Sequence, residues 1–180
     1  MSAADQLTLA RALSVPFVVL LYALDFNGHN YWATALFAVA MATDWFDGRL
    51  ARRHGRTSPL GSLLDPVADK ILVLAVMVML VEAGVVPGWM VAAIVVREFL
   101  VSGLRLAALE RGVVLHARDL GKLKTWSQAV AAGVGGFAAA GAWRDEIAWW
   151  SFLVALVLTW VSGLDYARVA PRLWRGGAPA

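Results

Sequence analysis

Four aspartates stand close together in a chain that is otherwise rich in apolar residues. Asp44 and Asp47 are three positions apart, and Asp65 and Asp69 are four apart. Because side chains three or four positions apart share one face of a helix, each pair is expected to point one way. If the two segments run antiparallel, both pairs reach the same level, roughly 9 Å from the connection between them at helical rise.

Four converging carboxylates repel one another unless a cation binds them. Hard oxygen ligands, in a chain without cysteine, favour Mg²⁺ or Mn²⁺. Four acids suffice for two such ions about 3.5–4 Å apart, a site that can hold a diphosphate and stabilise in-line displacement at phosphorus. The alternative is a set of buried ion pairs between aspartate and arginine, which needs no fixed arrangement of four acids.

Small residues and one arginine interleave with the acids. Gly48, Ala51 and Gly61 would allow close approach of a ligand or of a neighbouring helix. Arg52 follows on the same predicted helix, where its guanidinium could meet a phosphate oxygen. This pattern favours a phosphate site over simple ion pairing.

The elements that must carry these residues read as membrane helices. Apolar residues make up 60% of the 180 residues and charged residues 16%, against about 45–50% and 25% in soluble domains. A bilayer core of about 30 Å requires roughly 20 apolar residues as helix, and continuous runs of this length exclude the strands of a membrane barrel.

We therefore predict an all-α, polytopic membrane bundle, a single domain over 1–180 with a disordered tail after about residue 174. Its six transmembrane helices would cover 7–25, 31–53, 60–84, 87–110, 122–143 and 146–170. The first is expected to be retained rather than cleaved as a signal peptide, because no basic segment precedes it.

Lysine and arginine predict how the bundle is oriented. Basic residues concentrate between the second and third spans, between the fourth and fifth, and near the C-terminus, whereas the opposite connections contain only Arg144. Because basic loops stay on the cytoplasmic side, both termini and the aspartates are expected at the cytoplasmic face of the cell membrane. The formal charge of +3 is too small to indicate nucleic acid as a partner.

Residues 44–69, DWFDGRLARRHGRTSPLGSLLDPVAD, resemble the signature of the CDP-alcohol phosphotransferase family, D-x2-D-G-x2-A-R-x8-G-x3-D-x3-D. Every fixed position matches. The resemblance implies a six-helix, homodimeric enzyme using Mg²⁺ or Mn²⁺. It implies that Asp44, Asp47, Asp65 and Asp69 bind metal, that Asp69 is also the catalytic base, and that the CDP pocket is lined by Gly48, Ala51, Arg52 and Gly61.

Further segments are similar to one branch of this family, the phosphatidylglycerophosphate synthases. They are residues 6–11 with Pro16, 65–70, 97–98, 102–105, 121–125 with Gln128, and 162–166. The resemblance implies transfer of a phosphatidyl group from CDP-diacylglycerol to glycerol 3-phosphate. The acceptor phosphate needs its own cations, and those expected at the cytoplasmic ends of spans four and five, with one hydroxyl donor, are Arg105, Lys122, Lys124 and Thr125.

Three alternatives stay open on the sequence. The first is another acceptor within the family: inositol phosphate, serine or phosphatidylglycerol. The others are a metal-dependent prenyltransferase, which also uses paired aspartates, and a non-enzymatic cation transporter. Two local expectations accompany them: Lys124-Thr125 should open a helix with free N–H groups, and Arg97-Glu98 is interpreted first as a structural ion pair, with substrate contact as the alternative.

Overall fold

The computed structural model describes the backbone of residues 3–54, 59–110 and 119–175, and the side chains of 10–43, 70–110 and 121–164. Within these ranges the chain is entirely helical, with no strand. The helices are α1 (Ala3–Ala23), α2 (His29–His54), α3 (Pro59–Glu82), α4 (Gly88–Glu110), α5 (Asp119–Ala139) and α6 (Asp145–Arg175). Each predicted run has its own helix, and the predicted tail beyond Arg175 lies outside the described residues.

Two of the connections end the preceding helix in the same way. Gly84 has a φ of 76° and donates its N–H to the Val81 carbonyl at 3.0 Å, while the Val85 N–H reaches the Leu80 carbonyl at 3.1 Å. This pair of hydrogen bonds is a Schellman motif, which favours glycine because its central residue is left-handed. Gly141 repeats the motif at the end of α5, with φ of 74°. Both helices therefore stop where the sequence supplies glycine.

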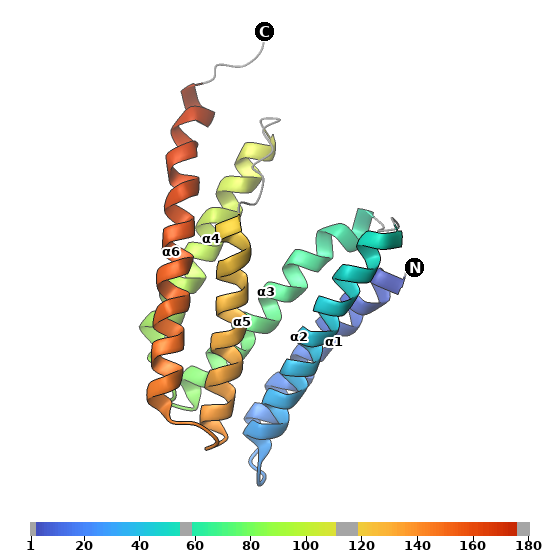
Figure 1. Ribbon diagram of the computed structural model, residues 1–180, viewed down its shortest axis with the longest axis vertical. Coiled ribbons are helices and arrows are strands. Elements are labelled where there is room, and N and C mark those ends of the chain that lie inside the picture. The colour runs from blue at the N-terminus through green and yellow to red at the C-terminus, as the bar shows by residue number, and fades with distance from the viewer. Residues whose placement is uncertain (1–2, 55–58, 111–118, 176–180) are drawn as a thin grey trace.

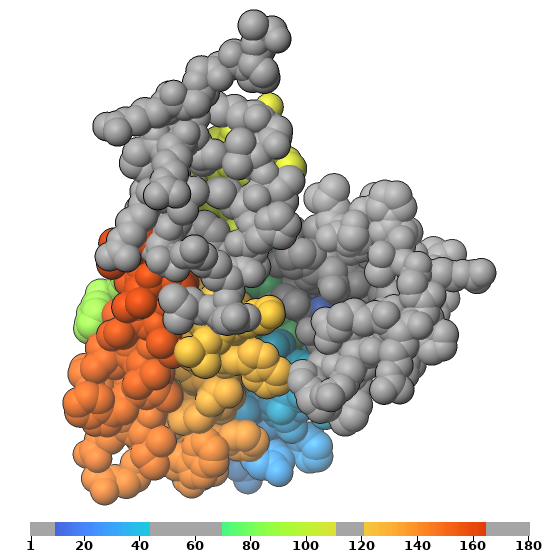
Figure 2. Space-filling view, turned by 45° about the horizontal axis from the view of Figure 1, so that its top comes forward, coloured from blue at the N-terminus to red at the C-terminus, as the bar shows by residue number. Residues whose placement is uncertain are grey.

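The six helices run alternately up and down, so the start of α1 and the end of α6 lie at the same end of the molecule (Figure 1). The last turns of α2 and α4 and the first turns of α3 and α5 lie at that end too. Helix α1 packs against α2 and α3, α6 packs against α4 and α5, and α5 also contacts α2 and α3. The space-filling view shows α5 between α6 and α2 (Figure 2). Helix α5 thus joins the two halves of the bundle.

Two glycines of α5 make this joining possible. A Cβ added to Gly135 would lie 2.6 Å from the Leu80 side chain and 3.1 Å from that of Phe152. A Cβ added to Gly136 would lie 2.6 Å from the Tyr22 hydroxyl. Leu80 and Phe152 are fully buried, so they have little room to retreat. Close helix packing is therefore the role of these glycines, as their position in an apolar run predicts.

Every helix also presents large apolar side chains outward. The side chains of Phe17, Val39, Val78, Phe99, Val130 and Trp150, one from each helix in order, are all more than half exposed. By length and hydropathy, one helix within the described residues is apolar enough to cross a membrane, namely Asp145–Leu164 with a mean hydropathy of 1.8. A shorter apolar helix covers Ala10–Ala23.

Candidate active site

The predicted metal ligands lie on two consecutive helices. Asp44 and Asp47 belong to the C-terminal half of α2, and Asp65 and Asp69 to the N-terminal half of α3. These two halves reach the same end of the bundle (Figure 1). The four carboxylates themselves lie outside the described side chains, so their convergence on metal stays a prediction.

The predicted CDP pocket also stays a prediction. Gly48, Ala51 and Arg52 lie on α2 and Gly61 on α3, beside the aspartates along each helix, and their side-chain surroundings lie outside the description. Among the side chains that are described, no group of three or more histidines and acids could hold a metal ion. The aspartate-rich segment therefore remains the candidate metal centre on its donor chemistry alone.

A buried carboxylate on α4 gathers basic side chains from neighbouring helices. Glu98 is 4% exposed, and its Oε1 accepts hydrogen bonds from the Lys124 ammonium and, at 3.2 Å each, from Arg97 and Gln128. The Lys70 ammonium lies 3.7 Å from Oε2. We call these five residues, Lys70, Arg97, Glu98, Lys124 and Gln128, the Glu98 cluster.

Hydroxyl groups surround the cluster and tie it to α6. Arg97 donates to Ser162 Oγ, and Gln128 donates to Thr159 Oγ1 at 2.8 Å. On the other side, Lys70 donates to Ser102 Oγ at 2.9 Å. Helices α3, α4, α5 and α6 therefore meet around one carboxylate.

Among the side chains that the structure describes, most of the charge in the cluster is positive. Three cations surround a single carboxylate, and Arg97 and Lys124 are only 2% and 9% exposed. Buried charges are costly unless they are paired and hydrogen-bonded, so the contacts with Glu98 stabilise these buried cations. The interpretation of Arg97-Glu98 as an ion pair is confirmed, but Arg97 is one of three cationic partners rather than the only one.

The predicted acceptor residues occupy different environments. Lys124 is in the Glu98 cluster, whereas Lys122 is exposed and Arg105 is half-buried on α4. Thr125 is exposed, and its hydroxyl donates to the Gly121 carbonyl at 3.1 Å. Their joint binding of a phosphate stays a prediction.

One expectation about this segment is wrong. Helix α5 begins at Asp119, five positions before Lys124. Only the first four N–H groups of a helix lack partners within it, so those of Lys124 and Thr125 are not free to bind an anion. The predicted span, 122–143, starts late because it was placed on apolar residues. The helix itself begins about one turn earlier.

The sequence contains a signal for the cluster that the prediction did not use. Lys124 and Gln128 are four positions apart, and Thr159 and Ser162 are three apart, so each pair shares a helix face. Polar pairs of this kind inside apolar runs indicate a polar contact within the bundle. The sequence pattern gives no partner for Lys70, and its contact with Glu98 comes from the structure.

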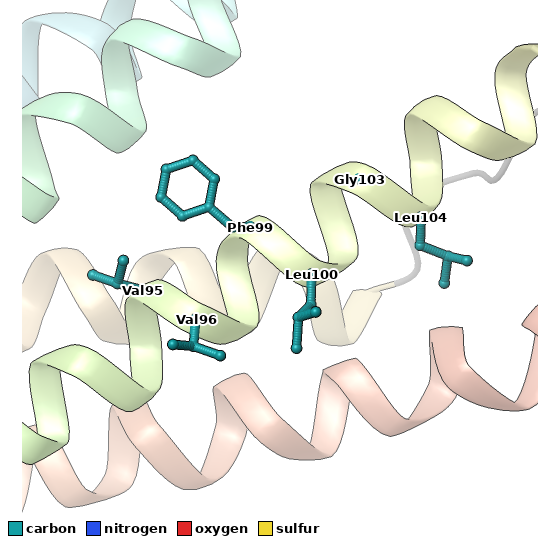
Figure 3. Close-up of a pocket in the computed structure, with 6 residues that line it drawn as sticks. All are labelled: Val95, Val96, Phe99, Leu100, Gly103 and Leu104. Carbon is teal, nitrogen blue, oxygen red and sulfur yellow. The ribbon is translucent and has the colours of Figure 1, made fainter.

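The opposite face of α4 is apolar. Figure 3 shows a shallow pocket there, lined by side chains of α4 alone. Val96, Phe99 and Leu100 are each more than half exposed. The complete lining is Val95, Val96, Phe99, Leu100, Gly103 and Leu104. Helix α4 thus separates a charged interior from an apolar exterior.

The amino-acid sequence is similar to that of known phosphatidyltransferases. Residues 1–161 match the family model described as CDP-alcohol phosphatidyltransferase. A protein of Bacillus subtilis (strain 168) named CDP-diacylglycerol–glycerol-3-phosphate 3-phosphatidyltransferase is 39% identical over 139 residues, covering 71% of this chain and 72% of the relative.

Two further relatives extend over more of the chain. An Escherichia coli (strain K12) protein with the same name is 39% identical over 176 residues, covering 91% of this chain and 92% of its own length. A Mycobacterium tuberculosis (strain H37Rv) protein named probable phosphatidylglycerophosphate synthase is 40% identical over 174 residues, covering 94% of this chain and 81% of the relative. The similarity includes both the aspartate-rich segment and the helices of the Glu98 cluster.

Proposed function

We infer the activity from a plain premise: the chain belongs to the CDP-alcohol phosphatidyltransferase family, whose model matches residues 1–161. It is an enzyme of phospholipid synthesis, and it transfers the phosphatidyl group of CDP-diacylglycerol to glycerol 3-phosphate. The products are phosphatidylglycerol phosphate and CMP. The observation that carries this assignment is the identity of about 40% over most of the chain to relatives named for this reaction.

We propose that the chemistry takes place where α2 and α3 approach the end of the bundle that also contains the chain termini. Asp44, Asp47, Asp65 and Asp69 would hold two Mg²⁺ or Mn²⁺ ions. Bound metal would neutralise the diphosphate and the charge that develops during displacement at phosphorus. Gly48, Ala51, Arg52 and Gly61 would line the pocket for the CDP group.

Asp69 then acts as the general base. Its carboxylate takes the proton of the acceptor's 1-hydroxyl, and the hydroxyl oxygen forms a bond to the β-phosphorus, which bears the diacylglycerol. The bond from this phosphorus to the bridging oxygen breaks, and CMP leaves with that oxygen. One bond replaces another in line, so no covalent enzyme intermediate is required.

The acceptor phosphate requires cations close to the base. We propose Arg105, Lys122, Lys124 and Thr125 for this role. Lys124 supports the proposal most directly, because it shares Glu98 with Lys70, the residue that follows Asp69 in α3. The acceptor would therefore bind between α3, α4 and α5.

We propose six membrane-spanning helices with both termini and the active site on the cytoplasmic side. The exposed apolar side chains on all six helices support this, because water-soluble monomers rarely expose contiguous apolar surface. Helix α4 contains the charged residues Arg97, Glu98 and Arg105, but Arg97 and Glu98 are buried inside the bundle. Inward-facing charges of this kind are the ones that membrane helices tolerate. A homodimer completes the proposal and rests on family resemblance alone.

The test is release of CMP by the purified protein in detergent with CDP-diacylglycerol. Glycerol 3-phosphate is compared with inositol 1-phosphate, serine and phosphatidylglycerol as acceptors, each with Mg²⁺ and with Mn²⁺. We expect release with glycerol 3-phosphate and formation of phosphatidylglycerol phosphate. Preferential turnover of another alcohol would contradict the proposed acceptor and leave the family reaction standing.

A further inference from the structure

The Glu98 cluster joins α3, which bears the proposed base, to α5, which bears a proposed acceptor ligand. Lys70 immediately follows Asp69, the proposed base, on α3. Lys124, a proposed acceptor ligand, comes from α5. Both ammonium groups contact the carboxylate of Glu98, on Oε2 and Oε1 respectively. One side chain on α4 therefore contacts a cation from α3 and a cation from α5.

The physical reason is charge. Without the carboxylate, the ammonium groups of Lys70 and Lys124 would lose the anion that they share, and they would repel each other. Removing one partner of a buried pair leaves the other charge uncompensated, which favours movement of that side chain toward water. Lysine has a long flexible stem and can make that movement easily.

We propose that Glu98 is a positioning residue for the acceptor alcohol phosphate: it holds Lys124 and Lys70 at a fixed separation beside the proposed base. This rests on the proposed function. The surrounding bonds support a positioning task, because Gln128 on α5 donates to the carboxylate and Ser162 on α6 accepts from Arg97.

The decisive variants are Glu98→Gln, which removes the charge with little change of shape, and Glu98→Asp, which keeps the charge on a shorter stem. Thr159→Val is the matched control. It removes the hydroxyl that accepts from Gln128, is just as buried, and leaves the contacts of Glu98 with Lys70 and Lys124 in place. The Michaelis constants for glycerol 3-phosphate and for CDP-diacylglycerol are measured separately, with kcat and the melting temperature.

For Glu98→Gln we expect the KM for glycerol 3-phosphate to rise at least about tenfold and the KM for CDP-diacylglycerol to change less than about threefold. Glu98→Asp should be intermediate. Thr159→Val should lower the melting temperature without separating the two KM values.

Three outcomes would overturn the proposal. A parallel rise of both KM values, or the same split in Thr159→Val, would indicate general loosening of the bundle. A fall in the KM for glycerol 3-phosphate would mean that Glu98 competes with the substrate for the cations. If Glu98→Gln is not recovered folded, Glu98→Asp decides, and an unchanged KM for glycerol 3-phosphate in that variant contradicts the proposal.

Assays of the wild-type enzyme distinguish failure of this proposal from failure of the proposed function. If wild type releases CMP only with another alcohol, the proposed acceptor is wrong. The same variants measured with that alcohol still decide whether Glu98 positions the acceptor-side cations.

Discussion

Lys124 on α5 forms an ion pair with Glu98 on α4 inside the helical bundle, and the same carboxylate faces Lys70 on α3. Lys124, which is predicted from the sequence to bind the acceptor phosphate, is thus already paired with a carboxylate of the protein. Preorganisation of this kind lowers the cost of collecting charges when the substrate arrives. Lys124, a proposed acceptor ligand, is thereby linked through Glu98 to α3, the helix that bears the proposed base.

Replacing the proposed base should separate chemistry from binding. Asp69→Asn keeps the size of the side chain and removes its ability to accept a proton. We expect turnover to fall by at least about a hundredfold, the lower range for general base catalysis, with CDP binding largely kept. CMP release and isothermal titration with CDP measure the two effects. A variant with a near-normal rate would remove Asp69 from this role.

Metal removal should stop the reaction without unfolding the protein. The carboxylates proposed as ligands repel one another when no cation binds them, but their segments are short parts of long helices. We expect EDTA to abolish CMP release, and Mg²⁺ or Mn²⁺ to restore it while Ca²⁺ does not, because Ca²⁺ favours longer bonds and more ligands. Circular dichroism should stay helical throughout. Full activity after exhaustive chelation would contradict the metal proposal.

The helices could be predicted from the sequence almost completely, whereas the Glu98 cluster could not. Apolar runs and the glycines at positions 84 and 141 act locally, so they determine where helices lie and stop. The cluster depends on how each helix is rotated about its axis and on which faces meet. The pattern places Lys124 and Gln128 on one face, but it does not say that this face meets Glu98 rather than solvent. Long-range packing supplies that information.

A buried hydrogen bond between α1 and α2 should matter for stability alone. The Tyr22 hydroxyl and Thr34 Oγ1 lie 2.9 Å apart, and both residues are buried. Tyr22→Phe should cost about 1 kcal/mol, the usual net contribution of such a bond, and lower the melting temperature in detergent without changing either KM. Tyr31→Phe is the control, because Tyr31 is half exposed and its ring contacts are kept. An equal loss in both variants would contradict a specific role for the bond.

Glycine at position 163 leaves room for Arg97, and filling that room should perturb the Glu98 cluster from α6. A Cβ added to Gly163 would lie 2.9 Å from Arg97 Nε and 3.4 Å from its Cγ, and Arg97 is too buried to move aside freely. Gly163→Ala should therefore displace Arg97 from Ser162 and Glu98, lower the melting temperature and raise the KM for glycerol 3-phosphate. Gly103→Ala on α4 is the matched control. Its new Cβ would meet nothing within 4 Å, and alanine in an open helical position stabilises by roughly 0.5–1 kcal/mol. The two substitutions add the same methyl group. Equal changes in melting temperature and in the KM for glycerol 3-phosphate would therefore show that the space beside Arg97 is not required.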